Sequence, residues 1–111
     1  MEKKIKIKDE EITIRFNLAV QMLYEDISGI PFKLEDLKFQ KYIVCLYMAA
    51  IIANNENTEI TLEWLANEAT NEEIKAIDDA IGECMTDFLH LPDIMAEKPA
   101  ETEDEGEQPK N

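Results

Sequence analysis

The sequence has few of the residues from which small enzymes build their sites: one histidine, two cysteines and three glycines among 111 residues. His90, Cys45 and Cys84 are too widely spaced to form a zinc-binding pattern, and no serine or cysteine has a histidine in a recognisable local motif. Three glycines are too few for a phosphate-binding loop, and no calcium-binding loop is present. We therefore expect no catalytic residue, no cofactor and no metal, and a protein that is not an enzyme.

Long hydrophobic runs and a signal peptide are missing as well. The longest apolar run, Tyr42–Ala53, has twelve residues, whereas a membrane-spanning helix needs about 20. Nothing at the N-terminus is typical of a signal peptide. Cys45 and Cys84 lie within apolar patterns, which predicts buried, reduced thiols. We expect a protein of the cytoplasm that does not bind membranes.

Positive charge is the next deficit, since 25 acids and 11 bases give a net charge of −14. The imbalance is uneven: residues 1–16 carry five bases and four acids, residues 17–91 four and fourteen, and residues 92–111 two and seven. Such a field repels nucleic acid phosphates and anionic lipids and favours basic partners. We expect no nucleic-acid partner, although an acidic surface that is simply solvated explains the same charge.

The run Tyr42–Ala53 is the feature around which the rest of the chain is organised, because all twelve of its residues are apolar. A helix that is apolar on every side must be enclosed by other elements or by a second copy of itself. A chain of 111 residues is long enough to bury a real core without disulfides or metals. We expect one globular domain over residues 1–91 and a disordered acidic tail over residues 92–111.

Residues 4–16 alternate between apolar and polar side chains, a pattern typical of a half-buried β-hairpin. A two-residue loop at Asp9 and Glu10 would oppose Ile7 to Ile12 and keep the isoleucines on one face. Because this loop lacks glycine, a longer loop with a shifted pairing is the alternative. The lysines of the first strand either form a basic docking strip or, more commonly, protect an edge strand from unwanted pairing.

Helical spacing and capping residues predict about four helices over residues 17–91, so the expected fold class is mainly α (α+β). Asn17 has the side chain of an N-cap for a helix that reaches Ser28, and Gly29 suits its left-handed end. A short helical turn is expected over residues 34–37, and the apolar central helix is expected to end near residue 55. The hairpin and the helices would together enclose that central helix.

Two more helices are predicted after the central one. A short helix of about two turns starts near Thr61, and Thr70 with Glu73 forms a capping box at the start of a longer one. The apolar positions of that last helix form a narrow seam suited to another helix. They are Ile74, Ile77, Ile81, Cys84 and Phe88, widened by Met85 and Leu91.

Three stretches carry a resemblance to a known family. They are Phe16-Asn17-Leu18-Ala19 followed by Glu25-Asp26-Ile27-Ser28-Gly29, the run Leu46-Tyr47-Met48-Ala49-Ala50, and Thr61-Leu62-Glu63-Trp64-Leu65. Over residues 4–90 the chain resembles the small tail assembly chaperones of long-tailed phages and prophages. The resemblance implies a non-enzymatic protein of the bacterial host cytoplasm. Its partners would be the long hydrophobic tape measure protein, which it coats, and the tail tube protein. The acidic tail is similar to the C-terminal extension that a frameshift adds in some members.

Aromatic and apolar residues of the helical part are the candidate partner-binding residues. Tyrosine and tryptophan anchor many protein contacts, although in small domains they more often belong to the core. We expect a groove or a self-association surface around Tyr24, Phe32, Tyr47 and Trp64, with an uncovered strip of the central helix near Tyr47 and Ile51. The alternatives are an acidic regulatory module that imitates DNA and a structural homo-oligomer.

Overall fold

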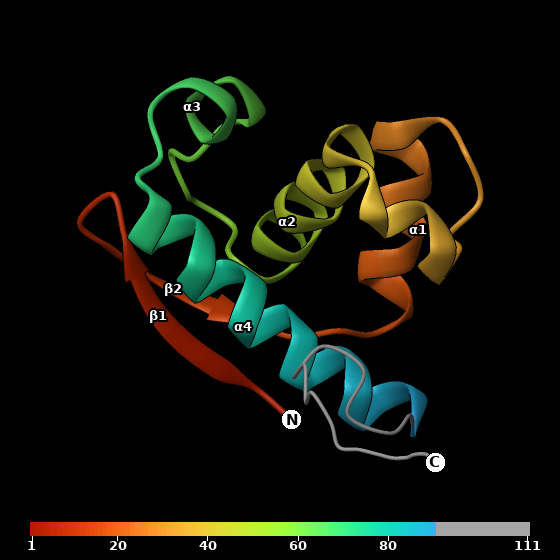
Figure 1. The fold of residues 1–111 in the computed structure, drawn as a ribbon. Helices are drawn as coiled ribbons and strands as arrows, with labels where there is room; N and C mark the ends of the chain where they lie inside the picture. Colours follow the sequence, from red (N-terminus) through yellow and green to blue (C-terminus); the bar gives the residue numbers. More distant parts are fainter. Residues whose placement is uncertain (91–111) are drawn as a thin grey trace, which may run out of the picture.

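The helix α2 (Gln40–Asn54) lies at the centre of the computed structural model, which describes residues 1–90. It packs against α1, β2, η1, α3 and α4 (Figure 1). The other elements are, in chain order, β1 (Lys3–Ile7), β2 (Glu10–Ile14), α1 (Leu18–Ser28), the 3-10 helix η1 (Leu34–Lys38), α3 (Leu62–Asn67) and α4 (Asn71–Leu89). The expected fold class, a hairpin followed by a small helical bundle around the apolar helix, is confirmed. The end of the expected domain at residue 91 and the expected tail over residues 92–111 lie outside the described residues.

The hairpin turns one residue earlier than the sequence pattern predicted. Lys8 and Asp9 form the two-residue loop with φ angles of 51° and 61°, so Ile7 pairs with Glu10 and Ile5 with Ile12. The expected loop at Asp9 and Glu10 is therefore wrong. Of the alternative, the shifted pairing is right and the longer loop is wrong, because the loop has two residues. Aspartate tolerates the left-handed conformation that such a turn requires. Long-range contacts then fix this register at both sides of the loop.

Those contacts come from Glu10 and Glu73. The Glu10 carboxylate accepts hydrogen bonds from the Thr58 hydroxyl at 2.8 Å and the Glu59 backbone N–H at 3.1 Å. The Glu73 carboxylate accepts from the Lys8 backbone N–H at 3.0 Å. The hairpin tip is thus tied to the loop between α2 and α3 and to the first turn of α4.

The capping residues of the helices act as the sequence predicted. The Asn17 side chain accepts a hydrogen bond from the Val20 N–H at 3.1 Å, and Gly29 ends α1 with φ of 80°. Thr70 and Glu73 form the reciprocal capping box of α4. Backbone donors of Thr70 and Lys8 hold the pKa of the Glu73 carboxyl below its usual range. These local motifs set where α1 and α4 begin, because they satisfy N–H groups that the helix itself leaves open.

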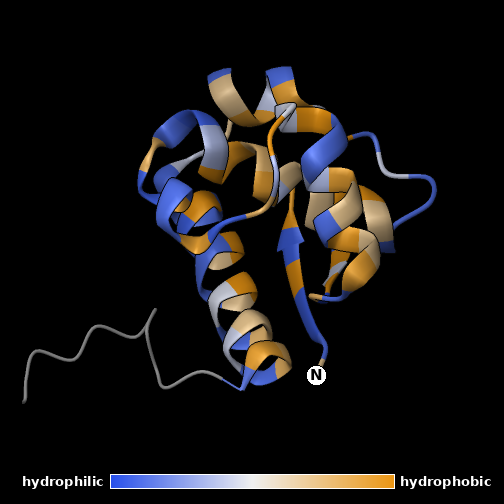
Figure 2. Ribbon diagram, turned by 90° about the vertical axis from the view of Figure 1, so that its right-hand side faces the viewer, coloured by the Kyte–Doolittle hydropathy of each residue, from blue (hydrophilic) through white to orange (hydrophobic). Residues whose placement is uncertain are grey.

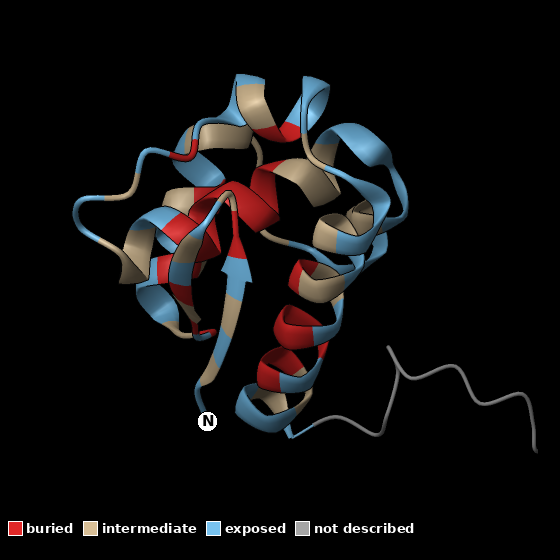
Figure 3. Ribbon diagram, turned by 90° about the vertical axis from the view of Figure 1, so that its left-hand side faces the viewer, coloured by how far each residue is buried: buried red, intermediate tan, exposed pale blue. Residues whose placement is uncertain are grey.

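The core joins the hairpin to all the helices. Figure 3 shows that buried positions gather on the inward sides of the helices and strands. The α4 seam contributes Ile77, Ile81, Cys84 and Met85 to the core, whereas Ile74 is half-buried and Phe88 is 40% exposed. Hydrophilic residues interleave with the seam along α4 (Figure 2).

Cys45 and Cys84 are buried and unpaired, as their apolar surroundings predicted. Burial raises the pKa of both thiols, which lowers the fraction of reactive thiolate. Both therefore act as small apolar side chains of the core. None of the helices within residues 1–90 has the length and apolarity needed to cross a membrane.

Candidate functional site

The central helix α2 leaves no open strip at Tyr47 or Ile51. All seven residues over 45–51 are buried, with exposed fractions of 5% for Tyr47 and 0% for Ile51. The expectation of an uncovered strip there is wrong, because α1, α4, β2 and α3 together surround these two turns of the helix. Ile52 is the large hydrophobic residue of α2 that is exposed, at 42%.

Tyr47 is held in the core by a specific partner. Its hydroxyl donates a hydrogen bond of 2.9 Å to the Asp78 carboxylate on α4. Burial, followed by that hydrogen bond and the charge of Asp78, raises the pKa of the Tyr47 phenol far above its ordinary value. The residue therefore joins α2 to α4 and presents no surface to a partner in this conformation.

Tyr24 is also fully buried, on the inner side of α1. Its hydroxyl has no hydrogen-bond partner among the described residues. The Ser28 hydroxyl lies near enough to oppose the rise that burial causes in the Tyr24 pKa, but its own hydrogen bonds go to the backbone of Ile30. An unpaired hydroxyl in a core costs about 1–3 kcal/mol.

Phe32 and Trp64 are the two predicted contact residues that keep some exposed surface. Phe32 is half-buried, and its ring centroid lies 5.6 Å from that of Phe16 and 5.5 Å from that of Tyr24. Trp64 is half-buried on α3, with the Lys8 ammonium 5.8 Å from its ring centroid. The five predicted site residues therefore do not converge on one surface: three lie in the core and two lie at separate places on its margin.

The most exposed large apolar side chains lie on α1 instead. Leu18 and Met22 are each 64% exposed. They are four residues apart and so share one face of the helix, roughly 200° around the axis from the buried Val20 and Tyr24. Sequence reasoning missed this pair, although its spacing relative to the buried pair was readable in the sequence.

Carboxylates continue the same face of α1 toward its C-terminal end. Glu25 follows Leu18 by seven residues and Asp26 follows Met22 by four, and both are exposed. The Glu25 carboxylate also accepts a hydrogen bond from the Phe32 N–H at 2.9 Å, which fixes its position. No basic residue occurs in α1. We call Leu18, Met22, Glu25 and Asp26 the outer face of α1.

Two other candidates for a functional site are a metal-binding cluster and a depression beside β2. Within residues 1–90 no group of three or more His, Cys, Asp or Glu side chains is placed to hold a metal ion. A depression of about 440 Å³ beside β2 is lined by polar and charged side chains for the most part: Thr13, Arg15, Asn54 and Glu56, with Ala53.

Comparison with known proteins adds no assignment: no family model matches this chain, and no curated protein or solved structure matches it either. The chain's own surfaces are therefore the guide to its function. Among these, the outer face of α1 carries the most exposed pair of large apolar side chains, and exposed carboxylates lie on the same face.

Proposed function

We propose that this protein is a non-enzymatic tail assembly chaperone of a phage or prophage. It acts in the bacterial host cytoplasm, binds a helix of the tape measure protein and assists the tail tube protein to assemble around it. The observation that carries the proposal is the outer face of α1, where Leu18 and Met22 stay 64% exposed in a chain that encloses residues 45–51 of its apolar helix. Such a surplus of apolar helix surface is what a partner helix needs.

The outer face of α1 also suggests which helix would bind. Burying what is still exposed of Leu18 and Met22 would contribute on the order of 1–2 kcal/mol each. Glu25 and Asp26 lie on the same face and would favour basic residues one or two turns along the partner helix. The binding segment of the tape measure protein is thus amphipathic, with apolar anchors at positions i and i+4 followed by lysine or arginine.

The DNA-imitating alternative has less support. A protein that imitates DNA needs unpaired carboxylates along one face. Three exposed acids of α4, however, form ion pairs with ammonium groups of the chain. Asp79 pairs with Lys75 at 3.0 Å, Glu83 with Lys3 at 2.8 Å, and Asp87 with the N-terminal ammonium at 3.4 Å.

Co-expression tests the proposal. The full chain carrying an affinity tag is produced together with the tape measure protein encoded beside it, and the complex is purified. We expect the tape measure protein to be soluble only in the presence of this chain and to co-purify with it. The double variant Leu18→Asp/Met22→Asp is expected to lower the recovered tape measure protein at least about tenfold, equal to 1.4 kcal/mol of binding.

A matched double variant controls for added charge. Ile52→Asp/Leu62→Asp changes two other exposed apolar residues, at 42% and 41%, and adds the same charge. It should retain the tape measure protein within about twofold of the unchanged chain. If the tape measure protein is equally soluble alone and never co-purifies, the chaperone proposal is wrong. If both double variants lose it equally, the assignment to α1 is wrong.

A further inference from the structure

The two outer edges of the β-hairpin differ in the hydrogen-bond partners of their backbone groups. On the outer edge of β2, the Asn55 side chain accepts from the Thr13 N–H at 2.9 Å and donates to the Thr13 carbonyl at 2.8 Å. A side-chain amide thus takes the place of a neighbouring strand at Thr13 and closes that part of the edge. It also shows that the backbone groups of Thr13 point away from β1.

The outer edge of β1 is open. Thr13 pairs with Lys4, and this pair is not joined by backbone hydrogen bonds because those of Thr13 go to Asn55. Bonded and non-bonded pairs alternate along an antiparallel ladder, so the backbone N–H and C=O groups of Lys4 and Lys6 point outward. Among residues 1–90 these groups meet no partner. Figure 1 shows β1 at the margin of the molecule, with no described element beyond it.

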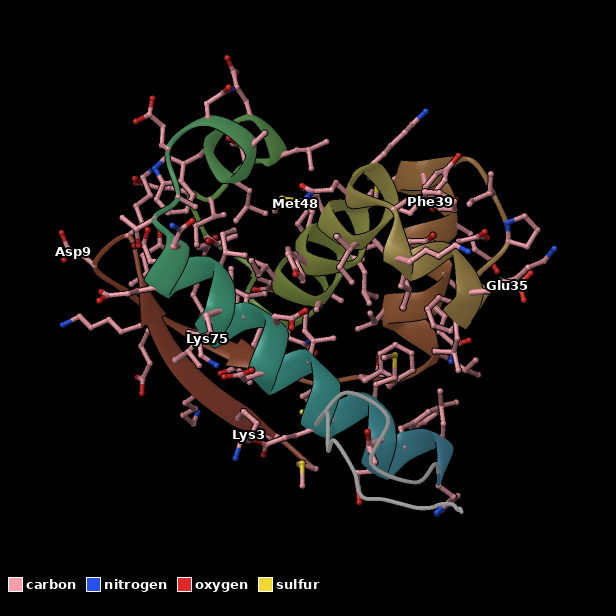
Figure 4. All side chains as sticks on the ribbon, viewed as in Figure 1. Lys3, Asp9, Glu35, Phe39, Met48 and Lys75 are labelled. Atoms are coloured by element: carbon pink, nitrogen blue, oxygen red, sulfur yellow. The ribbon has the colours of Figure 1, made fainter. Side chains whose placement is uncertain are left out.

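Along this edge, basic and apolar side chains alternate. β1 carries three lysines and no acid. Lys4 and Lys6 are exposed on the outer side of the hairpin, and Ile5 between them is only half-buried. A depression of about 510 Å³ is lined by Lys4, Ile5, Lys6, Asp9 and Glu11. Figure 4 shows Asp9 at the hairpin tip and Lys3 near the other end of β1, which mark the length of this edge.

We propose that the outer edge of β1 binds an extended segment of another protein in which acidic and apolar residues alternate, added to the hairpin as a third strand. The backbone groups of Lys4 and Lys6 bond to the backbone of the segment. Its acidic side chains lie about 5 Å across the ladder from the two lysines, and its apolar side chains lie beside Ile5. This surface is separate from the outer face of α1, so the proposal stands independently of the proposed function.

The negative net charge of the chain does not prevent this contact. Charges beyond about 8 Å are largely screened at physiological salt. The electrostatic attraction for a bound segment therefore depends on the charged groups beside the edge. Lys6 makes no ion pair within the described residues, and Lys4 is 3.5 Å from the Glu2 carboxylate. Glu10 is engaged at Thr58 and Glu59 and points away from the edge. The acids that compete with the segment are Glu11 opposite Lys6, Asp9 in the same depression, and Glu2 beside Lys4.

A second copy of the same edge is a poorer occupant. Pairing of β1 with another β1 would place lysines opposite lysines, which destabilises a ladder. Lysines on edge strands commonly serve to prevent such self-pairing. The same lysines attract an acidic strand. The edge therefore disfavours pairing with a second β1 and favours a partner strand of opposite charge.

Titration of the full chain with a synthetic peptide tests the proposal. The probe is the blocked peptide TEVEVET, in which glutamate and valine alternate, and the control is TEEEVVT, which has the same composition. We expect TEVEVET to bind at least about tenfold tighter. At saturation, amide hydrogen exchange at Lys4 and Lys6 should slow at least about tenfold, because these N–H groups gain partners. The Thr13 amide, already bonded to Asn55, should not change.

Charge variants separate this edge from general attraction. Lys4→Glu/Lys6→Glu should weaken TEVEVET at least about tenfold, whereas Lys33→Glu/Lys38→Glu, with the same charge change away from the hairpin, should not. If either pair of substitutions unfolds the chain, the exchange measurement on the unchanged chain decides alone. Unchanged exchange at Lys4 and Lys6, or equal affinity for both peptides, would overturn the proposal.

Two further outcomes would identify a different occupant and so also overturn it. If neutralising the chain's own acids with Glu101→Gln, Glu103→Gln and Glu105→Gln tightens peptide binding about tenfold or more, the chain's own acidic segment competes for the edge. If Lys4 and Lys6 become protected when the protein concentration is raised without peptide, the occupant is a second copy.

Discussion

The neighbouring helices α2 and α1 use their apolar residues in opposite ways. α2 is apolar on every side, yet the fold covers all of its residues over 45–51. α1 is less apolar but leaves Leu18 and Met22 64% exposed. The comparison teaches that the amount of apolar sequence does not locate a binding surface. What matters is the apolar surface that remains after the core has been formed, and its two most exposed side chains lie on α1.

The largest expected effect comes from introducing a charge into the enclosed part of α2. Ile51→Asp buries a carboxylate without a partner and should cost at least about 4 kcal/mol of the free energy of unfolding. Tyr47→Asp is expected to behave in the same way, since Tyr47 is 5% exposed. Ile52→Asp, one residue along and 42% exposed, is the matched control and should cost about 1 kcal/mol or less. Urea unfolding followed by circular dichroism measures all three, and equal losses for Ile51 and Ile52 would contradict the enclosure of α2.

A smaller loss of stability is expected at Glu73, which joins α4 to the hairpin. Both Glu73 oxygens accept from backbone N–H groups, those of Thr70 and Lys8. Glu73→Gln would turn one acceptor into a donor and should cost about 1–2 kcal/mol at pH 7. Replacing Glu72, which makes no such contact in the described residues, with glutamine is the control and should be nearly neutral.

The Glu73 contribution should depend on pH in one direction. Its folded pKa is depressed below the ordinary 4.5, so its stabilisation is complete above that value and is lost as the pH falls through the folded pKa. The difference in unfolding free energy between the unchanged chain and Glu73→Gln should therefore shrink below pH 4.5. A difference that stays constant down to about pH 3 would show that the carboxylate is not the group responsible.

Substitution of Tyr24, on the inner side of α1, is expected to keep or raise stability, whereas the substitutions above lower it. Because its buried hydroxyl has no partner among the described residues, Tyr24→Phe should leave stability unchanged or raise it by up to about 1 kcal/mol. Tyr47→Phe is the informative contrast, since it removes the hydrogen bond to Asp78 and should cost about 1 kcal/mol or more. Thermal and urea unfolding of both variants would show the difference, and a loss for Tyr24→Phe would mean that its hydroxyl is satisfied.

The smallest effect on stability is expected at the outer face of α1. Leu18→Asp and Met22→Asp should each change the free energy of unfolding by no more than about 0.5 kcal/mol, because both side chains are mostly in water. A large loss at either position would show that this face supports the fold rather than a partner. Small losses at α1 and large losses at Ile51 would sharpen the contrast between the two helices.

The fold class and the helix caps were predictable from the sequence, and the hairpin register was not. The caps at Asn17, Gly29 and Thr70 follow from neighbouring residues, and the structure confirms them. The hairpin register depends on Glu10 and Glu73, whose partners lie 48 and 65 residues away. No local pattern contains that information.

The candidate site was predicted less well, for a related reason. Tyr47 and Ile51 are apolar residues of an apolar helix, and periodicity cannot say which side of such a helix its neighbours cover. Leu18 and Met22, by contrast, lie opposite Val20 and Tyr24 on an amphipathic helix. Counting which apolar residues fall outside the main stripe of α1 would have found them.

Photo-crosslinking can show whether the outer face of α1 contacts the tape measure protein. A photoreactive amino acid is placed at position 22 on α1 or at position 52 on α2 of the full chain, which is co-expressed with the tape measure protein and irradiated. We expect a covalent adduct with the tape measure protein from position 22 and none from position 52. Adduct formation from position 52 alone, while the two proteins still co-purify, would contradict it.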